Sequence, residues 1–321
     1  MRRVTGLIAG GLGAFLVVLA LLIRFVVVGE AVKFRLNENS ITTQIAAKAS
    51  YFSPSQLKVV SGVTLEDTLT VQGDNAAGNS SRAVWNEFSY VYDKTNHAPV
   101  TYSTNRLAFD RRTGVLINCC GTAIGTNTNP HVSGQGYVWP FNAQKQTYLV
   151  YNTTLLKTVP ATYAGTVTVD GLTTYKYVEN IPATRAGTQT LPGSLVGQQG
   201  TGLLTLREYF RGTTTEYVNP TTGTPVEEVS DQHLYLAGDS GRQVLSVLNA
   251  DFATTPSSVA AVVKTAKKEQ DEVELLSVLL PVAGGLAGII LLIAGVVLTL
   301  SRRRQVAYDE ADEYARGEVP A

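Results

Sequence analysis

Two adjacent cysteines, Cys119 and Cys120, are the residues in this sequence best suited to do chemistry. Consecutive Cα atoms lie about 3.8 Å apart, below the roughly 4.4 Å minimum of ordinary disulfides, so a bond between neighbours strains the backbone. Three interpretations compete: a structural disulfide between neighbours, a redox or mercury-type thiol site, and covalent pairing with another chain. We favour the structural bond, because no neighbour provides the lowered pKa that a working thiol needs.

A second motif, Gly238-Asp239-Ser240-Gly241, resembles the nucleophile signature of chymotrypsin-like proteases. A serine is inert without a base and a third group that orients the base. Arg242 stands where that signature has glycine, and His97, His131 and His233 lack the flanking residues of a catalytic histidine. We therefore expect a tight turn here, and no catalytic residue in the chain.

The composition excludes several classes of function. The 26 basic and 26 acidic residues cancel, and only 16% of residues are charged, which argues against binding of nucleic acid. Three histidines and two cysteines are too few for an evident metal site or a scaffold of several disulfides. We expect no cofactor, no metal and no enzymatic activity.

The elements that position these residues include a long apolar segment near the end of the chain. Residues 275–300 contain no charged side chain, follow the charged run 267–274, and precede Arg302, Arg303 and Arg304. About 20 apolar residues of helix cross a 30 Å hydrocarbon core. Because basic flanks stay in the cytoplasm, the three arginines place the C-terminus there.

The N-terminus repeats this pattern. Arg2 and Arg3 precede an apolar run at residues 4–23, with Arg24 and five further uncharged residues after it. A cleaved signal peptide is the alternative, but the run is longer than the usual 7–15 residues and no good cleavage site follows. We expect an uncleaved anchor. The predicted plan is a cytoplasmic start at 1–3, a transmembrane helix at 4–28, an extracytoplasmic domain at 33–274, a second transmembrane helix at 275–300 and a cytoplasmic tail at 301–321.

The region between the two apolar segments is predicted to be mainly β (α+β), with antiparallel hairpins. Short runs rich in Val, Thr and Tyr alternate with Gly, Asn and Asp, which is typical of antiparallel strands. Asp170-Gly171 is the strongest two-residue hairpin signal. We expect a helix around Ile45, a hairpin pairing 203–210 with 214–218, and a boundary between two lobes near 186–202.

Small residues recur at four-residue spacing in both apolar segments: Gly6 and Gly10 in the first, Gly284 and Gly288 in the second. Such spacing lets helix backbones approach closely. We predict that the two helices pack on each other or on other copies of the chain, which would make a homo-oligomer.

A family resemblance rests on residues 110–114 (Asp-Arg-Arg-Thr-Gly), the cysteine pair, and Trp139-Pro140-Phe141 followed by Lys145, Thr147 and Tyr148. Together they resemble the actinobacterial PorA-like membrane proteins over essentially the whole chain, most specifically at residues 137–151. Asn152 stands where an acidic residue is expected. The resemblance implies an actinobacterial envelope protein with a helix–ectodomain–helix plan, and its family name implies a porin.

These observations lead to a two-pass plasma-membrane protein of the cell envelope, without enzymatic activity. We expect its ectodomain to bind an envelope lipid, another apolar ligand or a protein partner. Trp139, Pro140 and Phe141 are the candidates for an apolar lip, although packing of these aromatic residues in the core is the favoured interpretation. The alternative function is a channel-forming oligomer, and an extracytoplasmic hydrolase is the weakest candidate.

Overall fold

The computed structural model describes residues 2–198, 202–238 and 241–315. It contains two compact units: one formed by Met1–Val32 with Gln270–Ala321, the other by Lys33–Glu269. The fold is mainly β, with apolar helices at the two ends of the chain, as the sequence predicts.

The first unit consists of helices. Helix α1 (Arg2–Leu22) continues through a π-helical turn (Ile23–Val27) into α2 (Val28–Ala31). At the other end of the chain, α3 (Pro256–Glu274), which belongs to the second unit as far as Glu269, continues through a π-helical turn (Leu275–Leu279) into α4 (Leu280–Ala315). Two segments, Val4–Ala31 and Pro256–Leu300, are long and apolar enough to cross a membrane.

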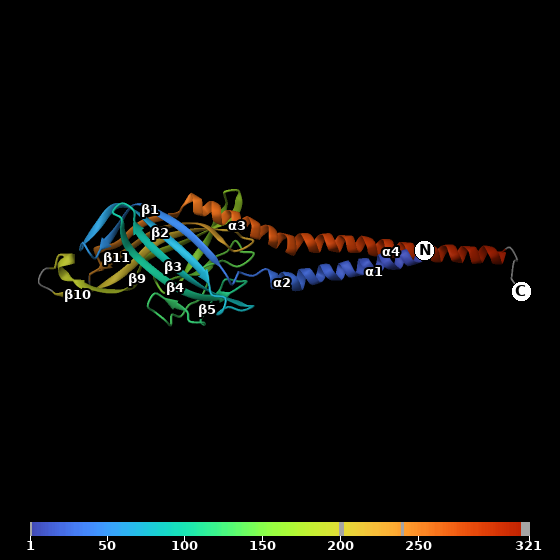
Figure 1. Cartoon of the computed structure of the whole chain (residues 1–321), viewed down its shortest axis with the longest axis horizontal. Helices are drawn as coiled ribbons and strands as arrows, with labels where there is room; N and C mark the ends of the chain where they lie inside the picture. Colours follow the sequence, from blue (N-terminus) through green and yellow to red (C-terminus); the bar gives the residue numbers. More distant parts are fainter. Residues whose placement is uncertain (1, 199–201, 239–240, 316–321) are drawn as a thin grey trace. The chain divides into compact units, whose positions relative to one another are not determined.

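The second unit contains, besides most of α3, one antiparallel sheet in which nearly every strand pairs with its neighbours in sequence (Figure 1). Its spatial order is β5-β4-β3-β2-β1-β12-β11-β10-β9-β8-β7, and β6 pairs with β4. The strands are β1 (Asn39–Ser53), β2 (Lys58–Gly73), β3 (Arg82–Asp93), β4 (Ala98–Asp110), β5 (Leu116–Ile117), β6 (Ala123–Ile124), β7 (Tyr148–Asn152), β8 (Lys157–Val169), β9 (Leu172–Pro192), β10 (Leu203–Val218), β11 (Pro225–Ala237) and β12 (Gln243–Thr254).

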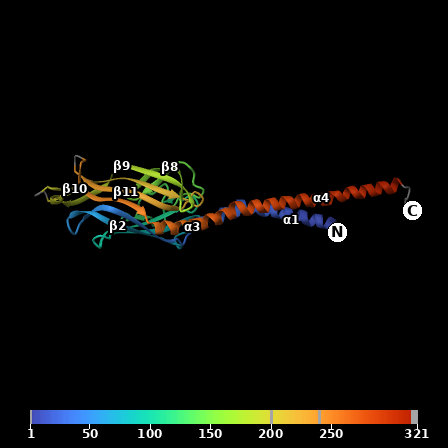
Figure 2. The same ribbon diagram turned by 90° about the horizontal axis from the view of Figure 1, so that it is seen from above.

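The sheet curls until its two edges meet, with β8–β11 and β2 on opposite walls (Figure 2). The residues Gly134 and Gln135 join the edges. The Leu116 amide donates to the Gly134 carbonyl at 2.8 Å, and the Gln135 amide donates to the Leu149 carbonyl at 2.7 Å. We call this closed arrangement the barrel.

The outer face of the barrel carries charged side chains within the strands. They include Glu66 on β2, Arg106 on β4, Lys176 on β9, Arg211 on β10 and Asp251 on β12. A transmembrane barrel instead presents an apolar band to lipid. The charged positions of these strands therefore interrupt any apolar band on the outer face.

Two predictions of local structure were wrong. The residues around Ile45 form part of β1 rather than a helix, because pairing with β2 and β12 overrides their local preference. The predicted hairpin at 203–218 is one continuous strand, β10. Gly212 does not mark a turn; it is required because a Cβ there would lie 2.1 Å from the Asp231 carbonyl oxygen on β11.

The Asp170-Gly171 hairpin does join β8 to β9, with φ values of 45° and 75°. Residues 186–192, part of the expected lobe boundary, belong to β9, and Lys33–Glu269 forms a single unit.

Candidate functional site

A ring of polar side chains lines the inside of the barrel. On each of several neighbouring strands, one or two inward positions carry polar residues between apolar ones. We call this ring the polar belt; its members are Gln44, Asp67, Glu87, Ser89, Asn105, Glu179, Thr214, Glu216, Glu228 and Ser230. Antiparallel register brings them together: Glu216 pairs with Glu228, Thr214 with Ser230 and with Glu179, and Glu87 with Asn105.

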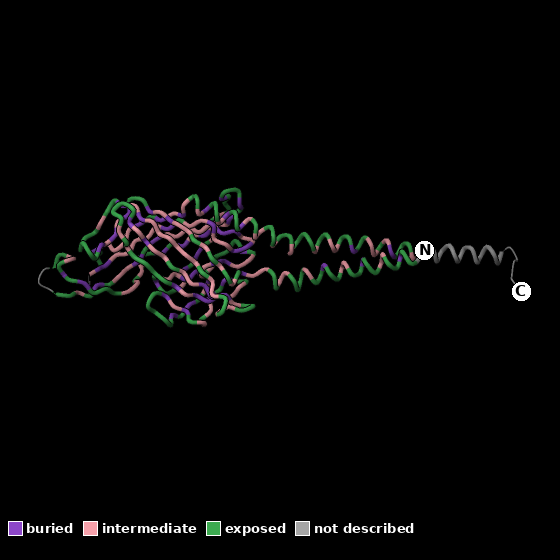
Figure 3. The backbone as a smooth tube through the Cα atoms, viewed as in Figure 1, coloured by how far each residue is buried: buried purple, intermediate pink, exposed green. Residues whose placement is uncertain are grey.

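Apolar clusters close the belt above and below. Ala49, Tyr51, Val63, Leu65 and Val91 pack together where β1 ends and β2 begins. At the other end, Trp85, Leu107 and Phe109 pack with Phe34 and Tyr151. Figure 3 shows residues of intermediate exposure running along strands between more buried ones. The belt therefore lies between two apolar layers of one barrel.

Three glutamates of the belt face one another and are strongly perturbed. Burial and the charge of Glu216 raise the pKa of Glu228 to about 8. Burial and the charge of Glu179 raise the pKa of Glu216 to about 7, although the Trp139 indole N–H donates to its carboxylate at 2.7 Å. Burial and the charge of Glu228 raise the pKa of Glu179 to about 7.

The opposite wall adds two further carboxylates. Burial raises the pKa of Glu87, which accepts a hydrogen bond from Asn105 at 2.8 Å. Burial also raises the pKa of Asp67, which accepts one from Ser89 at 2.7 Å. Both carboxylates also raise the pKa of Glu228, so the two walls interact across the interior.

Within the described parts of the chain, no cationic side chain balances this charge. Among the described residues, none of the five carboxylates forms an ion pair with a lysine, arginine or histidine. Glu216 and Glu228 are deep enough for burial to dominate their pKa values, yet part of each residue remains accessible to water. The belt is thus an acidic, partly hydrated interior.

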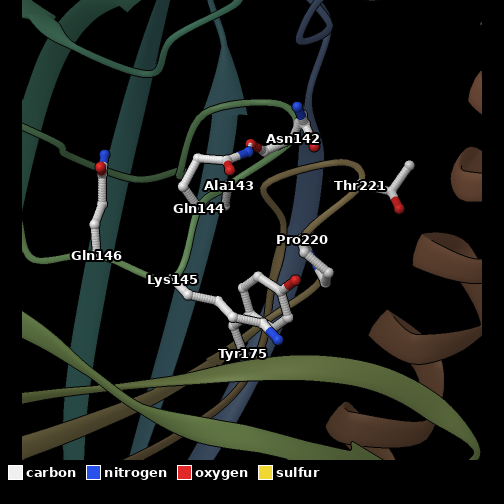
Figure 4. Close-up of a pocket in the computed structure, with 8 residues that line it drawn as sticks. All are labelled: Asn142, Ala143, Gln144, Lys145, Gln146, Tyr175, Pro220 and Thr221. Carbon is white, nitrogen blue, oxygen red and sulfur yellow. Dashed lines mark hydrogen bonds between the residues drawn. The ribbon is translucent and has the colours of Figure 1, made fainter.

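An open pocket of about 640 Å³ lies next to the belt, beyond an aromatic wall. Figure 4 shows its lining, including Gln144, Lys145 and Tyr175. The Gln144 carbonyl accepts a hydrogen bond from Tyr177 at 2.7 Å, and the Tyr177 ring stacks on Trp139 with centroids 4.0 Å apart. Trp139 in turn donates to Glu216, so the side chains of Tyr177 and Trp139 lie between the pocket and the belt.

Lys145 also contacts aromatic rings at this pocket. Its ammonium nitrogen lies 5.4 Å from the centroid of Tyr175 and 6.0 Å from that of Tyr163. Figure 4 shows the Lys145 side chain running alongside the Tyr175 ring. Aromatic faces attract cations within about 6 Å. A primary ammonium group therefore already rests on the aromatic rings beside the belt.

The structure places the cysteine pair and the Trp139-Pro140-Phe141 cluster in separate regions. Cys119 and Cys120 are joined by a disulfide in a turn, where Arg106 donates to the Cys120 carbonyl at 3.1 Å. Trp139 is buried with only 2% of its surface exposed, while Pro140 and Phe141 are partly exposed. Asp239 and Ser240 lie outside the described residues.

The glycines of the two apolar helices lie where α1 and α4 approach. A Cβ at Gly6 would lie 3.1 Å from the Gly295 carbonyl oxygen, and one at Gly288 would lie 2.8 Å from the Gly13 carbonyl oxygen. Gly10 contacts the same helix, because a Cβ at Gly295 would lie 2.6 Å from its nitrogen. Gly284 is less tightly packed, because a Cβ there would lie 3.7 Å from the Ala20 Cβ. Sequence reasoning missed Gly13 and Gly295.

Sequence reasoning also missed the polar belt. Its members are spread over residues 44–230 and share no local motif. The available signal was the recurrence of a glutamate at an inward position in strands such as 82–93 and 225–237, where alternation predicts an apolar residue. Without the register between distant strands, those positions cannot be assigned to one ring.

Comparison with known protein families identifies the family of this chain. A model of the family described as Porin PorA matches residues 5–297, which is nearly the whole chain. No curated protein matches the sequence.

Proposed function

Because this chain belongs to the Porin PorA family, we propose that it is a non-enzymatic membrane protein that takes a small cationic solute into its barrel. The two apolar helices anchor the chain in the membrane, with both ends in the cytoplasm and the barrel outside. One observation carries the proposal: five inward carboxylates share a partly accessible interior, and no cationic side chain of the described residues balances them.

Buried charge without a partner is costly, so the free protein must either hold protons on the belt or admit a cation. Protons and a cationic solute then compete for the same oxygen atoms. A lipid tail or other apolar ligand, which the sequence suggested, is not favoured, because it would remove water from ionisable groups and offer them no hydrogen bond.

Labelling of single cysteines tests whether solutes reach the belt. The described residues contain no free cysteine, so Thr214→Cys introduces one reactive thiol inside the barrel. Thr215→Cys is the matched control, since the next residue of β10 points to the opposite face. Each variant is treated with methanethiosulfonate reagents of similar size, one positively charged and one negatively charged.

We expect Thr214→Cys to react at least several-fold faster with the positive reagent than with the negative one, because the carboxylates attract cations. Thr215→Cys should show a much smaller preference. If the Thr214→Cys thiol reacts with neither reagent, or prefers the negative one, the proposal is wrong.

A pore is the second candidate, favoured by the family description and by the same polar interior. The charged outer face of the strands keeps them out of lipid, so such a pore would require several copies packed through the apolar helices. In a planar bilayer, this candidate predicts cation-selective conductance that Glu228→Gln reduces and Glu227→Gln leaves unchanged. A bilayer that stays closed at high protein content rules it out.

A further inference from the structure

If the proposed function holds, the positions and hydrogen bonds of the carboxylates in the polar belt indicate which class of cation binds there. We propose that the barrel binds a linear amine with at least two ammonium groups, one held by Glu179, Glu216 and Glu228 and another by Asp67 and Glu87. Among these five carboxylates, Glu179 alone accepts no hydrogen bond from the described residues.

Glu179 is the side chain that most directly indicates a bound ligand. It is 5% exposed, and its carboxylate accepts no hydrogen bond from any described residue. A buried carboxylate accepts up to four hydrogen bonds and is rarely left without one. Its strongest electrostatic neighbour is Glu228, so it faces the shared interior rather than a protein donor.

The arrangement does not fit a metal ion. Calcium and transition metals need several oxygen or nitrogen ligands within about 2.6 Å of one point. Within the described parts of the chain, no group of three acidic, histidine or cysteine side chains is close enough to hold a metal. Carboxylates that interact but do not converge suit a cation that carries its charge on separate N–H donors.

Two observations favour primary ammonium groups on an extended molecule. The carboxylates need donors, which a quaternary ammonium lacks, whereas each primary ammonium offers three N–H groups. They also occupy two walls: Glu179, Glu216 and Glu228 lie on β9–β11, and Asp67 and Glu87 lie on β2 and β3. A linear diamine suits this arrangement, because its carbon chain separates two ammonium groups that can serve one wall each.

Titration calorimetry on the full chain in detergent tests this proposal with three probes: 1,4-diaminobutane, 1-aminobutane and calcium chloride. The diamine should bind at least about tenfold more tightly than the monoamine, since a second charge-assisted hydrogen-bonded pair forms. Calcium should not displace it at equal concentration. Similar affinities for the two amines, or displacement by calcium, would overturn the assignment.

Substitutions locate the site. Glu179→Gln should weaken diamine binding at least about tenfold, because it removes the charge that lacks a partner. Glu227→Gln, on the outer face of β11, should change it less than about twofold. Thermal melts of both variants confirm that they are folded, and diamine binding by Glu179→Gln equal to that of the unaltered chain contradicts the proposal.

The result also separates this inference from the proposed function. If Thr214→Cys reacts with the positive reagent but the diamine does not bind, the barrel admits cations and only the amine assignment fails. If Thr214→Cys does not react and no amine binds, both proposals fail.

Discussion

At the scale of single residues, the carboxylates of the belt make the protein sensitive to pH. Each glutamate has a pKa of 4.5 when unperturbed, and burial raises those of Glu179, Glu216 and Glu228 to about 7, 7 and 8. The folded state then holds protons that the unfolded chain releases. The free energy of unfolding is therefore greatest below about pH 4.5, with respect to these groups, and falls as the pH rises towards 8.

The first prediction is that Glu228→Gln flattens this dependence. The melting temperature of the unaltered barrel should fall by several degrees between pH 5 and pH 8.5, and the amide should remove roughly half of that fall. Asp251→Asn, which alters an exposed carboxylate on the outer face of β12, is the control. Circular dichroism melts across this pH range provide the measurement, and an unchanged slope in Glu228→Gln would contradict the assignment of the raised pKa.

Some of these residues could be interpreted from the sequence alone, and others could not. The cysteine pair and the Asp170-Gly171 turn act through their immediate neighbours, so local chemistry predicts the possible bond and the hairpin. Glu216 and Glu228 face each other only because β10 pairs with β11 in one register. Their raised pKa values depend on residues far apart in the sequence, which no local pattern identifies. The sequence alone therefore did not predict the belt.

At the scale of elements, close backbone approach decides which glycines matter. Gly212 lies in the middle of β10, where a Cβ would overlap the Asp231 carbonyl oxygen of β11. Sequence patterning treated it as part of a turn, since glycine within a strand pattern is ambiguous. The sheet pairing removes that ambiguity.

The second prediction follows from this contact. Gly212→Ala should destabilise the barrel by about 1–3 kcal/mol, because the strands must separate to admit the methyl group. Gly187→Ala on β9 is the control, since its Cβ would lie 3.6 Å from the Glu208 carboxylate. Urea denaturation of both variants measures the difference, and equal midpoints would show that β10 and β11 adjust freely.

The third prediction concerns the apolar helices. A Cβ at Gly6 would lie 3.2 Å from the Leu298 Cβ, close to the 3.5–4.5 Å span of a disulfide. Gly6→Cys with Leu298→Cys should therefore cross-link within one chain on oxidation, whereas Gly11→Cys with Leu298→Cys should not, because nothing lies within 4 Å of a Cβ at Gly11.

Electrophoresis without reductant distinguishes the outcomes of that cross-linking. A mobility shift of the monomer supports packing of α1 on α4 within one chain. Dimers as the main product would mean that the helices meet between copies instead.

At the scale of the whole molecule, the proposed topology places both chain ends in the cytoplasm and the barrel outside. The fourth prediction tests it in intact cells with a thiol reagent that does not cross membranes. Thr215→Cys in the barrel should be labelled, and Ser301→Cys, which follows the apolar segment, should be labelled only after the cells are permeabilised. Labelling of both sites in intact cells would reject a common cytoplasmic location of the two ends.

The general plan of the chain was predictable because it depends on long, redundant signals. Twenty-six consecutive uncharged residues at 275–300 predict a long apolar helix whatever their neighbours do. Runs rich in Val, Thr and Tyr likewise predicted antiparallel strands, and the Asp170-Gly171 turn joins two of them. Closure of the sheet through Gly134 and Gln135 was not predictable, because these two residues carry no strand pattern and bond to strands on both edges.

The pairing of the first strand with the last has a consequence for biosynthesis. β1 pairs with β12, with Gln44 opposite Thr254. One edge of β1 therefore stays unpaired until almost the entire domain has been synthesised. Pairings this distant in sequence form slowly, and an uncovered strand border invites association with other chains. If translation stops before residue 243, that edge of β1 has no strand to pair with, and such truncated products should aggregate or be degraded.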